Sequence, residues 1–448
     1  MNRINTPFKV SLLATSISLA AFSGTANAAA FGIAEQSVTG LGAAFSTGST
    51  AAGDASTVYS NPAGMSFLKN RNAADFGANV IDPNAKFKNN NSKHVTTANL
   101  TGGNGGDAGP VALVPNFYYT RAINDKWTAG VGINAPFGLV TDYKKGWVGR
   151  YHALHSEIKT ININPSVSYK ASDTLSWGVG LSAQYIDANI SNAVDFGTIF
   201  ATAGRTPQGD DGEAIITGDD WTFGYNFGML WQATPQTRIG AAYRSRIKHK
   251  LKGKADFRTN TAVTALIAGG AGGGAFVDSD ATADLTLPDS LSVGIQHQVN
   301  NKLAINGDIT WTNWSVVEEL RVKFDNAVQP DSVTTLKYED SNRYSLGMTY
   351  NQSDQWTWRA GVAFDEATTP NAELASIRVP DGDRTWLTAG FTYKPSKKMS
   401  VDFGVAHLFV EDVEVRKTAA GEDRLKGGLV GEYEVDVNII SAQARWSF

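Results

Sequence analysis

Cationic side chains recur at every second position in the stretch that follows Thr237. Because successive side chains of a β-strand point to opposite faces, residues of one parity form a single column. The cationic parity holds Arg244, Arg246, Lys248, Lys250 and Lys252, and the opposite parity holds Tyr243, Ile247 and Leu251. If the apolar parity faces lipid, the cations face the inside of the fold, where low dielectric strengthens their attraction for an anionic head group. The alternatives are charge balance with acids such as Asp308, Asp365 and Asp402, and solvation of the outermost lysines.

Other reactive residue types do not assemble into a recognisable catalytic or metal site. The six histidines are His94, His152, His155, His249, His297 and His407. No Gly-x-Ser-x-Gly elbow is present, and His152 and His155 have no second pair to complete a zinc site. The acidic run Asp210–Glu213 lacks the full calcium-loop pattern. We therefore expect no enzyme activity, no metal and no cofactor.

The N-terminus has the pattern of a secretion signal. Arg3 and Lys9 precede an apolar stretch from Val10 to Ala21, and the small-residue site Ala26-Asn27-Ala28 follows. The apolar stretch is far shorter than the ~20 residues that a membrane-spanning helix needs. We expect residues 1–28 to be removed, so that the mature chain begins near Ala29.

Composition limits the remaining classes of protein. The 448 residues include no cysteine, so no disulfide framework or thiol chemistry is available. The net charge of −4 becomes −6 once a signal with two cations and no acid is removed, and this acidic balance argues against a nucleic-acid partner. The mean hydropathy of −0.21 suits a soluble protein, but strands that alternate lipid-facing and lumen-facing residues give the same weak signal.

Alternation of apolar and polar residues is the dominant pattern. At the C-terminus Ile440, Ala442, Ala444, Trp446 and Phe448 oppose Ser441, Gln443, Arg445 and Ser447. The same split recurs over 161–169, 175–182, 221–231 and 356–365, with aromatic residues near the ends of the apolar faces. Aromatic girdles of this kind border the lipid band of a membrane barrel. Terminal Phe448 resembles the signal through which outer-membrane proteins contact the barrel-assembly machinery, and outer-membrane lipid is the expected surrounding.

Short and long connections alternate along the chain between these segments. Short turns are expected at residues 124–125, 172–173, 234–235, 300–301, 353–354 and 395–396. Long polar or Gly-rich stretches lie near 83–110, 136–158, 191–219, 254–280, 325–335, 366–383 and 411–430. Six short turns and a strand at each end predict a closed all-β fold over residues 71–448, a transmembrane antiparallel β-barrel of about 14 strands in the bacterial outer membrane, with both termini periplasmic.

Residues 29–70 do not alternate and are rich in Gly, Ala, Ser and Thr. This composition suits either a flexible periplasmic tail or a compact plug. A barrel of about 14 strands leaves a lumen that wall side chains alone do not fill, so we expect these residues to form an N-terminal hatch that plugs the lumen.

The ordered set of motifs resembles the FadL-type transporters of long-chain fatty acids, which include relatives that import aromatic hydrocarbons. The matching motifs are residues 31–41, Asn61-Pro62-Ala63, Pro136-Phe137-Gly138-Leu139, residues 147–151, 242–245 and 364–365, and Pro380–Trp386. The likeness covers essentially the whole mature chain. It implies passive uptake of a long-chain fatty acid or another hydrophobic small molecule. One departure is Glu339, near the start of the tenth strand, where some family members carry a lysine.

The resemblance also implies where the ligand binds and leaves. It is captured from outside in an apolar groove between two extracellular loops, here residues 136–158 and 191–219, and then moves to an inner pocket near the N-terminus. The candidate groove residues are Leu139, Trp147, Tyr151, Leu154, Phe196, Ile199 and Phe200. Exposed apolar surface on loops often marks binding, although these side chains would equally pack each loop on itself.

The third strand is expected to break where it meets Pro136. Proline lacks the N–H that a neighbouring strand needs, and Gly138 tolerates unusual backbone conformations, so the ladder should stop between residues 134 and 138. The resemblance implies a lateral exit here, gated by the hatch through Phe31, Asn61, Pro62 and Ala63; a strand that simply ends at Pro136 is the alternative. We expect a monomer. The competing functions are an aromatic-hydrocarbon channel of the same family, a general porin and an outer-membrane lipid hydrolase.

Overall fold

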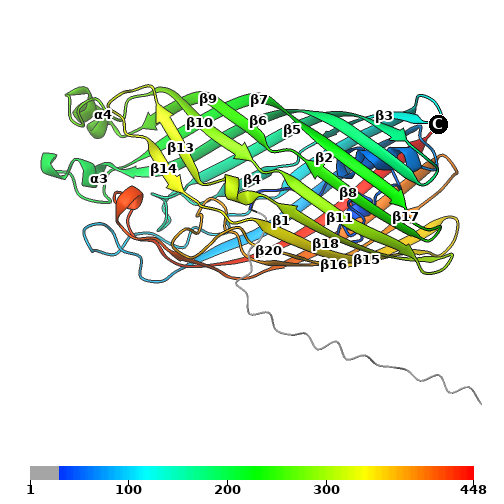
Figure 1. Ribbon diagram of the computed structural model, residues 1–448. Coiled ribbons are helices and arrows are strands. Elements are labelled where there is room, and N and C mark those ends of the chain that lie inside the picture. Colours follow the sequence, from blue (N-terminus) through cyan, green and yellow to red (C-terminus); the bar gives the residue numbers. More distant parts are fainter. Residues whose placement is uncertain (1–29) are drawn as a thin grey trace, which may run out of the picture.

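The computed structural model describes residues 30–448 (Figure 1), so the expected signal peptide lies outside the described residues. The strands, in chain order, are β1 (Ala73–Asn89), β2 (Ala112–Ala122), β3 (Trp127–Asn134), β4 (Gly138–Asp142), β5 (His155–Lys170), β6 (Leu175–Asp195), β7 (Asp211–Gln232), β8 (Thr237–Arg244), β9 (Ile247–Arg258), β10 (Ser279–Leu287), β11 (Ser290–Gln298), β12 (Leu303–Thr312), β13 (Glu319–Phe324), β14 (Ser332–Thr335), β15 (Ser341–Asn351), β16 (Trp356–Asp365), β17 (Arg384–Tyr393), β18 (Met399–Val410), β19 (Val413–Arg416) and β20 (Val430–Ser447).

All of these strands belong to one antiparallel sheet that closes on itself. Strand β1 pairs with β20 over seventeen residue pairs, from Ala73 with Ser447 to Asn89 with Gly431. Six strands continue the preceding one after a short interruption (β4, β9, β11, β13, β15 and β19), so the chain crosses the barrel 14 times. The predicted all-β barrel of about 14 strands is confirmed, and closure leaves no free strand edge at the seam.

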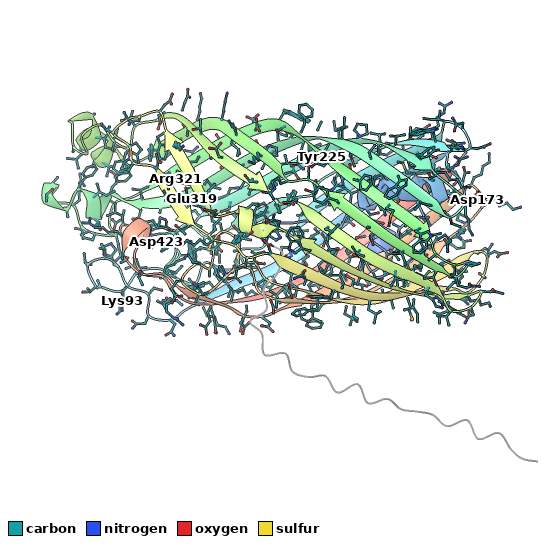
Figure 2. The ribbon with its side chains drawn as sticks, viewed as in Figure 1. Lys93, Asp173, Tyr225, Glu319, Arg321 and Asp423 are labelled. Atoms are coloured by element: carbon teal, nitrogen blue, oxygen red, sulfur yellow. The ribbon has the colours of Figure 1, made fainter. Side chains whose placement is uncertain are left out.

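The two faces of the wall match the predicted alternation. Phe223, Tyr225 and Phe227 are exposed on the outside, where Figure 2 labels Tyr225, while Gly224 and Asn226 between them are buried. The outer apolar residues would meet lipid, and the inner small and polar residues meet the lumen. All six short turns fall where the sequence predicts them, at the end of the barrel that holds the C-terminus in Figure 1.

Helices are few and short: α1 (Val38–Leu41), α2 (Thr57–Ser60), η1 (Pro62–Phe67), α3 (Phe196–Ile199), η2 (Ala201–Ala203), α4 (Thr261–Ala268), η3 (Trp314–Val316) and η4 (Gly421–Asp423). Within residues 30–448, no helix has the length and apolar character needed to cross a bilayer. The elements α1, α2 and η1 come from the segment before β1, which lies inside the barrel and is mostly buried.

Lumen-facing glycines make room for that segment. An added Cβ at Gly178 would lie 2.3 Å from the Ala63 nitrogen, and one at Gly240 would lie 2.0 Å from the Ser49 carbonyl oxygen. Gly361 and Gly347 meet Ala43 in the same way. These lumen-facing glycines of β6, β8, β15 and β16 therefore let the backbone of the inner segment approach the wall closely.

Candidate functional site

A cavity of about 200 Å³ lies between the inner segment, residues 30–72, and the wall of the barrel. We call this inner segment the hatch. Hatch residues 32–37, Phe45 and Tyr59 form one side of the cavity, and residues of β8, β11, β12, β15 and β17 form the other. Three arginines, Arg244, Arg343 and Arg384, line the cavity together with two acids, Glu35 and Asp365, so the lining carries a formal excess of one positive charge.

The wall side of the cavity has a row of charged residues across three strands. Asp365 on β16 pairs in register with Arg343 on β15 and with Arg384 on β17. Arg384 donates to Asp381 Oδ1 at 3.0 Å. Arg343 has its Cζ 5.4 Å from the centre of the Phe45 ring. Its Nε is buried without a hydrogen-bond partner, and Arg343 forms no ion pair with any described residue. An unused guanidinium N–H in a buried setting is a donor for a ligand carboxylate.

Arg244 approaches the same cavity from the opposite wall. Its Nη2 donates to the Tyr59 carbonyl at 2.8 Å, and its Cζ lies 4.0 Å from the centre of the Tyr59 ring. Both contacts are with the hatch, so the guanidinium links β8 to the plug while it remains on the cavity surface. The prediction that Arg244 faces the lumen is confirmed.

Aromatic rings cover the cavity where the third strand is interrupted. The ring of Phe31 lies 5.0 Å from that of Trp314 and 6.1 Å from that of Phe137. Trp314 is fully buried, and its Nε1 has no hydrogen-bond partner among the described residues. Ile247, Leu251 and Leu285 extend this apolar cluster along the lumen. The combination of cationic and apolar lining suits a molecule with an anionic head and a hydrocarbon tail.

Asn61 anchors the hatch to the wall. Its Nδ2 donates to the Ser49 carbonyl at 2.6 Å and to the Met229 carbonyl of β7 at 2.9 Å, and its Oδ1 accepts from the Ala63 N–H at 3.1 Å. Pro62 begins η1, where the missing N–H is not needed. The Ala63 carbonyl accepts from Ser176 Oγ at 2.8 Å. Asn61, Pro62 and Ala63 thus form one tightly packed contact with β6 and β7.

The third crossing breaks where the sequence predicts. Strand β3 ends at Asn134 and β4 begins at Gly138, four positions later. Their partners on β5, Asn162 and Lys159, are only three positions apart. This one-residue bulge turns the backbone inward. The Pro136 carbonyl accepts from the Ile33 N–H at 2.9 Å, and the Gly138 N–H donates to the Phe31 carbonyl at 3.0 Å. The hatch therefore continues the ladder that the bulge interrupts.

One side of this break has no strand partner. Strand β2 pairs with β3 only from Phe117 to Ala122, whereas its pairing with β1 extends to Ala112. Among the described residues, the stretch from Ala112 to Asn116 has no ladder partner on the β3 side. Pro115 lies in this stretch. Proline has no N–H to donate to a neighbouring strand, so it is tolerated at such an unpaired edge.

The prediction of a single lumenal column of five cations is wrong. Between Arg244 and Gly253 the chain advances nine positions, while the paired residues of β7, Asn226 and Gly218, are only eight apart. This extra residue lies at Ser245–Arg246, between β8 and β9. It reverses the side-chain parity, because a shift of one residue exchanges the two faces of a strand.

The reversal turns the lysines of β9 outward. Ile247 and Leu251 join the lumenal apolar cluster, and Lys248, Lys250 and Lys252 are exposed on the outer face. Arg246, at the bulge, is paired with Asp289 at 3.0 Å. Of the predicted column, only Arg244 lines the cavity.

The predicted groove residues of the loops are mostly buried against one another. Trp147, Tyr151 and Leu154 pack in a cluster with Phe87 and Tyr433. Phe196 and Phe200 pack with Val263, and Ile199 lies against that cluster, while Leu139 of β4 packs against the cluster of Phe31 and Trp314. These clusters join several loops and strands, so the loops pack against one another and not each on itself, and ligand contact at these positions stays a prediction.

Sequence patterns do not single out two of the cavity residues, Arg343 and Trp314. Arg343 is an isolated arginine at the start of β15, but it shares parity with Ser345 and Gly347, which face the lumen. That parity is the one signal available for it. No pattern marks Trp314, because η3 interrupts the alternation of its strand.

Comparison with known proteins agrees with this architecture. Residues 19–448 match the family described as outer membrane protein transport protein (OMPP1/FadL/TodX). Outer membrane protein P1 of Haemophilus influenzae is 33% identical over 98% of this chain and 99% of its own length. The long-chain fatty acid transport protein of Escherichia coli K12 is 32% identical over 92% and 94%.

Solved structures give the same result. A Pseudomonas aeruginosa FadL homologue superposes with a TM-score of 0.87 at 27% identity, covering 94% of this chain and all of that one. The toluene transporter TodX of Pseudomonas putida shares the fold, with a TM-score of 0.67 at 19% identity over 88% and 94%. This chain is a bacterial outer-membrane protein and belongs to the OMPP1/FadL/TodX family of outer-membrane transport proteins.

Proposed function

We propose that the protein is a passive channel that takes up long-chain fatty acids or similar hydrophobic compounds. The observation that carries the proposal is the cavity between hatch and wall, where the unpartnered Nε of Arg343 and the guanidinium of Arg244 lie beside the rings of Phe45, Phe137 and Trp314. A carboxylate would lie on the arginines and a hydrocarbon chain on the rings. The names of two relatives, which describe transport of long-chain fatty acids and of toluene, support this class of ligand.

The proposed route has three steps. A ligand first reaches the extracellular loops, where the buried cluster of Trp147, Tyr151 and Leu154 must separate to expose apolar surface. It then occupies the cavity above the hatch. It finally leaves sideways between β2 and the bulge at Ala135–Phe137, after the hatch releases the backbone of Pro136 and Gly138. In this scheme the N-terminal segment expected at residues 29–70 is the plug, and the protein acts as a monomer whose folding uses terminal Phe448.

The arginines favour an acid over a neutral hydrocarbon as the preferred ligand. A site for toluene alone would leave the guanidinium of Arg343, which has no ion pair with a described residue, beside an apolar ligand, and an unpaired buried charge is costly. The experiment is binding of radiolabelled oleate to the purified protein in detergent, with hexadecane-derived neutral analogues as competitors, together with mass spectrometry of the molecules that co-purify. Saturable oleate binding that neutral analogues displace poorly is the expected result. The absence of saturable binding would contradict the proposal.

Two competing functions give different outcomes in the same preparation. A general porin would admit small sugars, so liposomes that contain the protein would swell in sugar solutions; the hatch-filled lumen predicts no swelling. A lipid hydrolase would release fatty acid from phospholipid vesicles. We expect neither activity.

A further inference from the structure

The outer face of β9 carries a run of lysines above the lipid-facing part of the wall. Lys248, Lys250, Lys252 and Lys254 are exposed, and the residues between them point into the barrel. None of the four forms an ion pair with a described residue within 4.0 Å. Their side chains are therefore available to a partner outside the chain.

Strand register adds a hydroxyl and a further ammonium group. Lys252 on β9 pairs with Thr282 on β10, and Thr282 pairs with Lys323 on β13. Neighbouring strands are ~4.8 Å apart, so the two lysines flank the threonine in one row on the outer surface. Lys250 follows on the same face of β9, roughly 7 Å along the strand. Ammonium and hydroxyl donors converging in this way suit a phosphate group.

The wall is interrupted beside this row. Thr312 on β12 pairs with Ser290 on β11, and Val322 on β13 pairs with Ala283 on β10. The chain therefore advances ten positions from Thr312 to Val322, whereas their partners Ala283 and Ser290 are only seven positions apart. The three additional residues form the inward excursion that contains η3 and carries Trp314 into the lumen. As a result β10 pairs with β13 over only three residue pairs, although it pairs with β9 over nine.

This interruption leaves a depression of about 550 Å³. Lys250, Lys252, Lys323, Thr282 and Thr286 line it, and the buried side chains of Leu251, Leu285 and Val317 lie beneath them. Arg321 and Glu319, labelled on β13 in Figure 2, also line it but pair with each other at 2.6 Å. The three lysines then face Asp284 and Glu318, which leaves an excess of one positive charge.

The depression lies just outside the lipid-facing band. Tyr243 on β8, Leu291 on β11 and Trp311 on β12 form the adjoining row of the outer wall toward the short turns. Aromatic residues at that position mark the boundary between hydrocarbon and head groups. Interrupted pairing is tolerated there because polar head groups and water satisfy the backbone, which hydrocarbon would not. Figure 1 shows β9, β10 and β13 side by side toward the loop end of the barrel.

We propose that this depression is a binding site for a phosphorylated lipid of the outer leaflet. The phosphate would lie on Lys250, Lys252, Lys323 and the Thr282 hydroxyl, and an acyl chain would lie along the outer row of Tyr243, Leu291 and Trp311. The site is on the outside of the wall and is separate from the transport cavity, so it does not depend on the proposed function.

The experiment measures lipid binding to the purified protein by native mass spectrometry. The probes are lipid A with both phosphates, the same lipid with the phosphates removed, and inorganic phosphate. The test variant is Lys252→Gln with Lys323→Gln, and the matched control is Lys254→Gln with Lys144→Gln, two exposed lysines that do not line the depression. Loss of charge-assisted bonds predicts binding of bisphosphorylated lipid A at least ~ten-fold weaker in the test variant and unchanged in the control.

Further arms exclude a folding defect and a different ligand. Lys252→Arg with Lys323→Arg should retain binding, and every variant should keep the strand-rich circular-dichroism spectrum of the native protein. Equal affinity for the dephosphorylated lipid, equal weakening in the control variant, or saturation by inorganic phosphate at the same concentrations would each overturn the assignment.

Discussion

Gly32 of the hatch and Phe137 of the third crossing are partners in an isolated antiparallel bridge. The flanking hydrogen bonds, from Ile33 N–H to the Pro136 carbonyl and from Gly138 N–H to the Phe31 carbonyl, hold the first hatch residues against the bulge. In the proposed route, the wall can open at this bulge only after the hatch releases these backbone groups.

A cross-link between these two residues tests the coupling. Gly32 and Phe137 are a non-hydrogen-bonded antiparallel pair. The Cα atoms of such a pair are ~4.5 Å apart, a distance that a disulfide spans. Gly32→Cys with Phe137→Cys should block oleate transport when oxidised and restore it on reduction, and the native absence of cysteine keeps the assay clean. Thr385→Cys with Phe409→Cys, a pair on the outer wall, is the control. Normal transport by fully oxidised protein would show that the hatch need not leave the bulge.

Loss of charge in the cavity should affect acids more than neutral ligands. Arg244→Gln with Arg343→Gln should weaken oleate binding roughly ten-fold or more, because a hydrogen bond to a charged group contributes ~1.5–3 kcal/mol. Binding of an uncharged analogue should change little. Arg246→Gln removes a neighbouring charge that pairs with Asp289 outside the cavity, and it should leave both affinities unchanged. Equal losses for both ligands would assign the two arginines a structural role.

Much of this architecture follows from local rules and was predictable. Alternation and turn residues locate the wall, and Pro136 locates the first interruption, because both depend only on neighbours in the chain. The bulge at Ser245–Arg246 was not predictable in the same way, since no proline or glycine marks it and only the register with β7 reveals the extra residue. Because this extra residue was not detected, Lys248 was predicted on the wrong face of the strand. Extra residues between β12 and β13 likewise made the position of Trp314 unpredictable.

Replacement of the hatch anchor should open the barrel. Asn61→Leu keeps the approximate volume but removes donors to the Ser49 and Met229 carbonyls and leaves them buried without partners. An unsatisfied buried group costs ~1–3 kcal/mol, so the hatch should leave its position more often. Planar-bilayer recordings should show a higher conductance than the native protein. Asn70→Leu, at an exposed position near the end of the hatch, should show native conductance.

Acidification should loosen the extracellular loops. Burial lowers the pKa of His152 to about 4, against the opposing attraction of Asp423, so the folded loop holds the ring neutral. In the unfolded loop the pKa would be ~6.5. Stability is therefore full above about pH 6.5 and falls as pH drops from 6.5 to 4, by up to about 3 kcal/mol.

Hydrogen exchange would measure this effect directly. Amides of residues 147–154 should exchange faster at pH 4.5 than at pH 7, after correction for the intrinsic rate, while those of β16 should not. His152→Gln retains a donor for the Gly427 carbonyl, which the native Nε2 contacts at 3.1 Å, and cannot become charged. Its loops should show no pH response. A response as large as that of the native protein would attribute the effect to other groups.

The contacts of Asn61 also constrain the order of biogenesis. Its side-chain amide donates to the carbonyls of Met229 on β7 and Ala241 on β8, which lie 168 and 180 positions later in the chain. The seam that seals the barrel pairs β1, directly after the hatch, with β20, the final strand. The contacts of Asn61 form only when β7 and β8 are in place. We therefore expect the segment that is synthesised first to reach its final position only after these two strands have formed.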